Sequence, residues 1–150
     1  EPVIGVDFYP TLMEAANVKR RKAALLDGRS LMPLLKDASA SLDRPALFWH
    51  FPAYLQGYTQ RHGAFRTTPA AAVRMGDWKL IEYFEDGALE LYNLKNDLGE
   101  KTNLAELESG KVKELHAAML KWRKETKAPV PTEKNPGYDP KAVFQAPKRK

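Results

Sequence analysis

Short apolar runs separated by turn residues dominate the middle of the chain. Three runs rich in Val, Ile, Leu, Trp and Tyr follow one another there: residues 72–75, 78–84 and 89–94. Gly76 and Gly87 each stand beside an Asp between two of these runs. Glycine readily adopts the positive φ of a tight hairpin turn, so this arrangement favours antiparallel pairing of neighbouring runs. The pattern predicts a three-stranded antiparallel meander.

The most apolar run of the chain predicts a fourth strand. Residues 46–51 lie between Pro45 and Pro52, and a short apolar run with prolines at its limits is typical of a buried strand. Side chains alternate along a strand, which puts Leu80 on one face of the sheet and Ile81 on the other. A sheet with apolar residues on both faces is expected to have a neighbouring layer on each.

Residues 109–127 predict a long helix. Its apolar positions recur at steps of three and four residues: Val112, Leu115, Met119 and Trp122. Such a stripe marks the buried side of an amphipathic helix. Ser109 is the expected N-cap, because its hydroxyl can accept a hydrogen bond from a free backbone N–H of the first turn. The stripe should cover one face of the sheet.

Two short helices are expected ahead of the strands, one opened by Asp7 and Pro10 and one over residues 31–36 after Ser30. The fold class is therefore α+β: a four-stranded antiparallel sheet with a long helix packed on one face and short amino-terminal helices. Residues 1–127 are interpreted as one domain. The Pro-rich residues 128–140 cannot be helical, and residues 128–150 are expected to form an extended carboxy-terminal arm with a disordered end.

Composition excludes several classes of protein and site. The 150 residues suffice for one domain with a real core. No apolar run approaches the roughly 20 residues that a membrane span needs. The absence of Cys excludes disulfides, thiolate metal ligands and a cysteine nucleophile. The net charge is +5, but the basic clusters at 19–22 and 148–150 are not interleaved with aromatic residues, which argues against nucleic-acid binding.

The candidate site lies in the long segment after the fourth predicted strand. Residues 52–69 form a connection without a clear strand or helix pattern, and loops of that length tend to be functional. It offers aromatic rings for stacking and Arg forks for oxyanions. The candidate substrate-binding residues are His50, Tyr54, Arg61 and Arg66. The alternatives are an ordinary flexible loop and, for His50, a core or loop-anchoring role.

No residue is assigned to catalysis or to a metal. The sequence has no Gly-rich phosphate loop, no H-E-x-x-H and no nucleophile elbow. The three histidines, His50, His62 and His116, are too far apart to have ligand spacing on one element. Hard cations need several converging oxygen ligands, and no such cluster is evident.

Six phrases in a fixed order resemble the carboxy-terminal subdomain of type I, formylglycine-dependent sulfatases of the alkaline-phosphatase-like superfamily. They are DFYPTLMEAANV, DGRSLMPLL, RPALFWHFP, RMGDWKLI, ELYNLKNDLGEKTNLAE and NPGYDP. The resemblance covers nearly the whole chain. Ala53 departs from it, because a second histidine often stands at that position in related sulfatases.

The resemblance implies a part of an enzyme that hydrolyses sulfate esters, with a sulfated carbohydrate as the expected substrate. It implies calcium and a formylglycine, made from Cys or Ser in C/S-x-P-x-R, for the full-length family member. Neither this motif nor the family's Asp and Asn metal ligands are found here. Residues 1–18 would join a missing amino-terminal catalytic domain, and this chain would shape the substrate mouth. A periplasmic or secreted location follows from the same resemblance.

Two alternative functions remain open from the sequence. One is a fragment of a related phosphodiesterase or phosphonate hydrolase, whose distinguishing residues would lie upstream. The other is a stand-alone carbohydrate- or polyanion-binding module, favoured by the basic charge and the aromatic loop. Apolar residues ahead of the sheet, Phe8, Leu12 and Met13, would normally meet the catalytic domain. Without that domain the fragment is expected to be inactive and to self-associate.

Overall fold

The chain divides into two units, Glu1–Pro45 and Ala46–Lys150, in the computed structural model. The structure describes residues 1–19, 26–56 and 65–133, and the side chains of all of these except Gln56, Phe65 and Arg66. Arg61 of the candidate site lies outside the described residues, as does most of the predicted arm.

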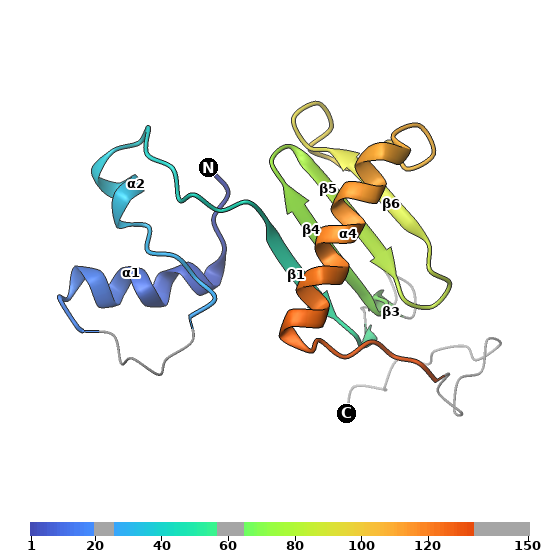
Figure 1. Cartoon of the computed structure of the whole chain (residues 1–150), viewed down its shortest axis with the longest axis horizontal. Helices are drawn as coiled ribbons and strands as arrows, with labels where there is room; N and C mark the ends of the chain where they lie inside the picture. Colours follow the sequence, from blue (N-terminus) through green and yellow to red (C-terminus); the bar gives the residue numbers. More distant parts are fainter. Residues whose placement is uncertain (20–25, 57–64, 134–150) are drawn as a thin grey trace, which may run out of the picture. The chain divides into compact units, whose positions relative to one another are not determined.

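The larger unit is built on a four-stranded antiparallel sheet (Figure 1). Its strands, in spatial order, are β1 (Leu47–Phe51), β4 (Ala70–Met75), β5 (Trp78–Tyr83) and β6 (Leu89–Asn93). The meander and the fourth strand are thus confirmed, with β1 paired to β4 at one edge. Both predicted hairpin glycines have positive φ, +56° at Gly76 and +74° at Gly87.

The segment between β1 and β4 departs from the expectation of a connection without secondary structure. It contains a second, two-stranded antiparallel sheet, formed by β2 (Leu55–Gln56) and β3 (Phe65–Thr67). Phe and Thr have the aromatic and β-branched side chains that favour strands. The strands are so short that no alternation along the sequence could reveal them.

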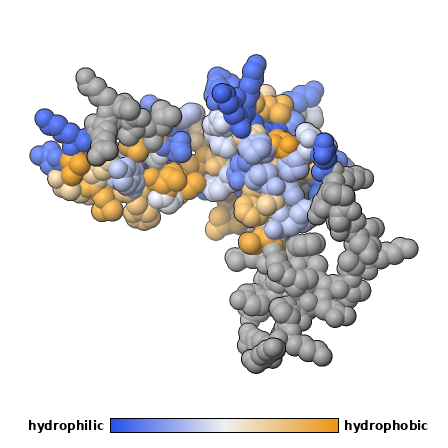
Figure 2. Space-filling model, turned by 90° about the horizontal axis from the view of Figure 1, so that it is seen from below, coloured by the Kyte–Doolittle hydropathy of each residue, from blue (hydrophilic) through white to orange (hydrophobic). Residues whose placement is uncertain are grey.

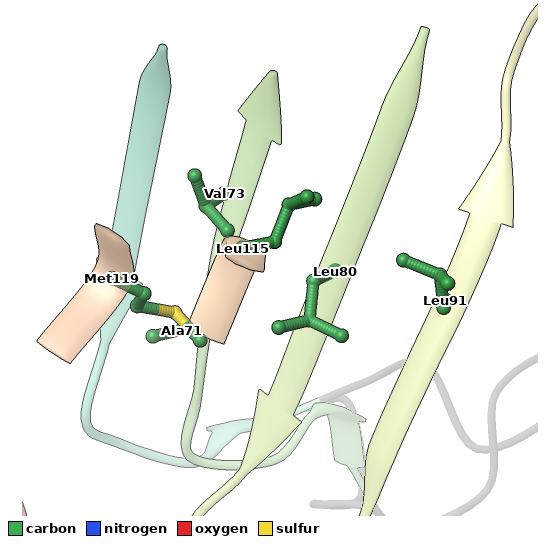
Figure 3. Close-up of a cluster of buried hydrophobic side chains, with 6 residues drawn as sticks. All are labelled: Ala71, Val73, Leu80, Leu91, Leu115 and Met119. Carbon is green, nitrogen blue, oxygen red and sulfur yellow. The ribbon is translucent and has the colours of Figure 1, made fainter. Parts of the chain in front are cut away.

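The core lies between the sheet and the long helix α4 (Ser109–Thr126). Leu115 and Met119 of the helix are fully buried against one face of the sheet (Figure 3). That face presents a row of fully buried apolar side chains from three adjacent strands: Ala71, Val73, Leu80 and Leu91. Val73 pairs with Leu80, and Leu80 with Leu91, so the row crosses the sheet in register. The predicted helix stripe is confirmed.

The predicted helix caps are displaced by one residue. In α4 the N-cap position belongs to Glu108, whose carbonyl accepts the N–H of Val112, and no side chain caps the helix. Ser109, the predicted cap, is already helical. The short helix α2 (Met32–Lys36) shows the same displacement and begins after Leu31. The Ser30 hydroxyl nevertheless accepts the Met32 N–H at 3.2 Å. Serine is the favoured N-cap residue, but helix ends vary by one or two residues and these two helices begin without a side-chain cap.

The smaller unit contains η1 (Gly5–Asp7), α1 (Phe8–Ala15) and α2, and its hydrogen bonds converge on Asp7. The Asp7 carboxylate is fully buried and accepts the N–H of Ile4, the N–H of Arg29 and an N–H of the Arg44 guanidinium, the last at 2.7 Å. One carboxylate therefore ties together three segments of the first 45 residues. The sequence indicated only a favourable charge ahead of α1.

Two further contacts fix the segment around Arg29. The Thr11 hydroxyl donates to the Asp7 carbonyl at 2.6 Å and accepts the Leu31 N–H at 2.8 Å. A Cβ atom on Gly28 would lie 2.1 Å from the carbonyl oxygen of Val6, so this position accepts only glycine without a backbone shift. The first two sequence phrases, DFYPT and DGRSL, are thus packing and hydrogen-bonding partners of each other.

Replacement of Asp7 should expose its role as an ionised acceptor. Burial by itself would raise the pKa of Asp7, but the hydrogen bonds from Arg44, Arg29 and Ile4 outweigh it, so the pKa is lowered. A lowered pKa stabilises the fold above the unfolded value of about 4, and this stabilisation is lost as pH falls through the folded value. Asp7→Asn should cost roughly 3–5 kcal/mol at pH 7, because Arg44 loses its buried partner.

Urea denaturation at pH 7 and at pH 3 measures this effect. The loss should be large at pH 7 and should shrink in acid, where the native carboxylate is also being protonated. The exposed Asp27 provides the control, since Asp27→Asn should change neither value appreciably. An Asp7→Asn variant with an unchanged midpoint at pH 7 would contradict the assignment.

Candidate functional site

His50 lies near the end of β1, with its ring on the helix-covered face of the sheet. Its Nε2 is 2.6 Å from the carbonyl oxygen of Pro129, just beyond α4. The ring is tilted against Phe84, 5.5 Å between centroids, and meets Trp122 edge-on at 6.2 Å. Nδ1 is buried and has no hydrogen-bond partner among the described residues. The ring therefore points into the interior and toward the start of the carboxy-terminal arm.

Tyr54, three residues beyond β1, is partly exposed and tied to the turn between β5 and β6. Its hydroxyl donates to Glu85 Oε1 at 2.6 Å. Glu85 follows Phe84 directly, so the anchors of Tyr54 and of His50 are consecutive residues. These contacts bring two of the four predicted site residues to the same end of the sheet.

The two arginines of the predicted site are described less fully. The backbone of Arg66 lies in β3, next to Phe65, which pairs with Gln56 of β2. This places residue 66 in the short sheet that follows Tyr54, without describing its side chain. Arg61 falls in the gap between the described ranges. Their membership of the site stays a prediction.

A charged cluster under α4 was not anticipated from the sequence. The Arg123 guanidinium contacts the Glu82 carboxylate, and His116 Nε2 lies 3.4 Å from the same Glu82 oxygen. Arg123 is 8% exposed and lies over the Phe84 ring, 5.4 Å from its centroid. A signal was available: Arg123 is four residues after Met119 on the apolar stripe, and Glu82 is two residues after Leu80 on the buried face.

The polar residues of the ELYNLKNDLGEKTNL phrase serve the connection after β6. Asp97 Oδ2 accepts the N–H groups of Lys101 and Thr102, both at 2.8 Å. Asn103 Oδ1 accepts the Leu91 N–H at 3.0 Å, while the Leu104 N–H donates to the Leu91 carbonyl. These bonds close the free edge of β6. The polar side chains of this phrase therefore stabilise the fold, because they accept hydrogen bonds from nearby backbone N–H groups.

An ion pair connects the segment after β6 to the neighbouring strand β5. Lys79 Nζ lies 2.7 Å from Glu100 Oε1, linking the lysine of RMGDWKLI to the glutamate of the later phrase. On the same face the hydroxyls of Tyr83 and Tyr92 both donate to Glu90 Oε2 at 3.0 Å. Burial and the nearby Glu90 raise the pKa of each tyrosine to about 12, so both stay protonated donors at neutral pH.

The described residues do not fit the calcium ion or the formylglycine of a sulfatase. No group of three or more His, Asp or Glu side chains in residues 1–19, 26–56 and 65–133 could hold a metal ion. The chain contains no Cys, and no Ser begins an S-x-P-x-R motif. No chemical step through either group is assigned to this chain. Within the same described ranges, no helix is long and apolar enough to cross a membrane.

Comparison with known proteins identifies the family. Residues 1–127 match the family model described as "N-sulphoglucosamine sulphohydrolase, C-terminal". A protein named "Sulfatase" from Formosa agariphila is 40% identical over 112 residues, covering 69% of this chain, and "Arylsulfatase K" from Danio rerio is 33% identical over 106 residues, also covering 69%. The chain belongs to the family of sulfatase carboxy-terminal domains, as the sequence motifs predicted.

A solved structure shows the same fold in a sulfated-sugar complex. The structure of BT4656 with its substrate D-glucosamine-2-N,6-O-disulfate superposes with a TM-score of 0.63 at 28% identity, over 86% of this chain and 25% of that one. The chain spans only about one fifth of the length of the curated relatives, 19% and 18% in the two cases. The similarity therefore concerns one part of larger proteins.

Asn103→Ala should destabilise the fold. The substitution removes the acceptor of the partly buried Leu91 N–H, which typically costs about 1–3 kcal/mol. The melting temperature of the protein should therefore fall. Asn96→Ala, at an exposed position of the same connection, is the matched control and should leave the melting temperature unchanged. An unchanged melting temperature of Asn103→Ala would show that the bond to Leu91 contributes nothing to stability.

Proposed function

We propose that this chain is the carboxy-terminal subdomain of an enzyme that hydrolyses sulfate esters of a sulfated carbohydrate. The match of residues 1–127 to a sulfatase carboxy-terminal family carries this proposal. The nucleophile and the metal site then belong to the amino-terminal part of the enzyme. In support, the polar side chains that resemble the family motifs are already used in internal hydrogen bonds and ion pairs.

The smaller unit supplies a surface on which the catalytic domain would dock. Phe8 and Leu12 lie one helical turn apart on α1 and are 63% and 66% exposed. Other large apolar side chains of this unit are also exposed: Val3, Val6, Tyr9, Val18 and Leu35. Figure 2 shows hydrophobic surface gathered on this unit, which Figure 1 draws in blue and cyan. Contiguous apolar surface of this kind marks a contact with another domain or chain.

The sheet offers a second surface of the same character. Helix α4 packs on one face, while Trp49 and Phe51 on the opposite face are 41% and 43% exposed. Between them and Ile81, strand β4 carries the small side chains of Ala70 and Ala72. The polar contacts of Lys79 and Glu90 occupy the β5–β6 part of that face, so its apolar part over β1 and β4 is where a further layer would pack. The amino-terminal catalytic domain is the proposed occupant.

Substrate contacts would come from the end of the sheet where β1 terminates. We assign Tyr54, Arg61, Arg66 and the neighbourhood of His50 to the wall of the substrate pocket. Tyr54 is held by Glu85 with part of its surface exposed, which suits a ring that stacks on a sugar. The arginines would bind sulfates remote from the reacting one. Binding energy from such remote contacts serves the natural substrate and is absent for small aryl sulfates.

The isolated chain tests the docking proposal. Sedimentation at rising concentration should show self-association, because the apolar surface on α1 lacks its partner. Leu12→Asp should weaken the association, whereas Leu98→Asp, at a position 82% exposed and outside α1, should not. The chain should also show no turnover of an aryl sulfate with added calcium. A strict monomer, or turnover abolished by a substitution within the chain, would contradict the proposal.

The intact enzyme tests the substrate wall. Tyr54→Ala combined with Arg61→Ala and Arg66→Ala should raise KM for the sulfated oligosaccharide while leaving kcat on a small aryl sulfate nearly unchanged. The matched control is Lys95→Ala, an exposed cation in the connection after β6. If the triple variant keeps full kcat/KM on the oligosaccharide, residues 52–69 only connect two strands and do not bind substrate. Faster turnover of a phosphonate ester than of any sulfate ester would favour the phosphonate hydrolase alternative.

A further inference from the structure

The carboxy-terminal arm returns to the sheet directly after α4. Lys127 adopts a left-handed conformation, with φ of +53°, and the Ala128 N–H caps the helix on the Arg123 carbonyl. This turn directs the next residues back across the end of the sheet, where Pro129 meets His50 (Figure 1). Pro129 and Pro131 favour an extended arm, since proline fixes φ and removes a backbone donor.

One ring nitrogen of His50 is hydrogen-bonded to the backbone of the arm, and the other is buried. The Pro129 carbonyl can only accept, so Nε2 of His50 carries the proton of the 2.6 Å contact. Nδ1 is buried, and no described residue donates to it. Phe84 and Trp122 contact the ring and restrict its rotation. His50 is thus oriented by the core and directed at the backbone of the arm.

We propose that His50 is a positioning residue that holds residues 128–133 against the end of the sheet, so that the arm forms a second side of the substrate wall. The anchor follows from the His50 contacts, and its effect on substrate binding rests on the proposed function. Tyr54 and Glu85 lie at the same end of the sheet as the anchored arm. Val130, one residue beyond the anchor, is 38% exposed, so the arm has accessible surface at this end of the sheet.

Two substitutions at position 50 separate the hydrogen bond from the packing. His50→Phe keeps a ring between Phe84 and Trp122 but removes the donor, whereas His50→Gln keeps an N–H at similar reach. Two truncations test the arm: ending the chain after Lys127 removes it, and ending it after Glu133 retains the anchored part. All four are made in the intact enzyme.

Hydrogen exchange measures the anchor. Exchange at the Ala128 amide, which donates to the Arg123 carbonyl next to the anchored Pro129, should rise roughly two- to tenfold in His50→Phe, the loss expected for one hydrogen bond, and should change little in His50→Gln. Steady-state kinetics test whether the arm contributes to substrate binding. KM for the sulfated oligosaccharide should rise in His50→Phe and in the truncation after Lys127, without adding when the two are combined. The truncation after Glu133 and turnover of a small aryl sulfate should be unaffected.

Each contrary result points to a different error. Unchanged exchange in His50→Phe would overturn the anchor. A raised KM in His50→Phe with a normal KM after truncation at Lys127 would make His50 a direct substrate ligand and overturn the positioning role. If the arm loosens and neither change affects KM, the arm is not part of the wall. If the variants of Tyr54, Arg61 and Arg66 are also without effect on KM, the proposed wall fails while the anchor itself stands.

Discussion

The attachment of α4 to the sheet is the constraint on which the larger unit depends. Leu115 and Met119 bury the apolar row of β4, β5 and β6, and removal of such a side chain typically costs about 2–5 kcal/mol. The charged pair of Arg123 and Glu82 lies at the border of the same interface. Moving Arg123 away would leave the Glu82 carboxylate without its ion-pair partner. The pair therefore restrains sliding of α4 along the sheet, in addition to the apolar contacts that hold its buried face. The end of α4 in turn determines where the arm begins.

The sequence predicted the regular elements well because their signals are local. Alternation and paired glycines located the strands, and a stripe at helical spacing located α4. Contacts between residues far apart in the chain could not be predicted from the sequence. Asp7 and Arg44 are 37 residues apart, and Glu82 and Arg123 are 41 apart, and no local pattern couples them. The helix caps were missed by one residue because the preference of Ser for the N-cap position is a local tendency, and the observed helices begin without a side-chain cap.

The candidate site was predictable only in part. The length and chemistry of residues 52–69 drew attention to the end of the sheet where β1 terminates, and the structure attaches His50 and Tyr54 to the adjacent Phe84 and Glu85. The partner of His50 could not be foreseen, because Pro129 follows it by 79 residues and contributes a backbone carbonyl that every sequence possesses. A carbonyl leaves no trace in composition or spacing. Only the fold shows that the ring faces inward.

The polar residues of the larger unit fall into two groups, those in the connection after β6 and those at the end of β1. Asp97, Glu100 and Asn103 use their oxygens on nearby backbone groups and on Lys79, so they cannot also bind a ligand without opening the edge of β6. Residues at the end of β1 combine internal anchors with exposed surface. In the proposed enzyme, a subdomain arranged in this way would alter which substrate is bound without altering the reacting groups, because remote contacts contribute binding energy separately from the chemical step. Differences in specificity between relatives should therefore concentrate in residues 52–69 and in the arm, while the β6 connection changes little.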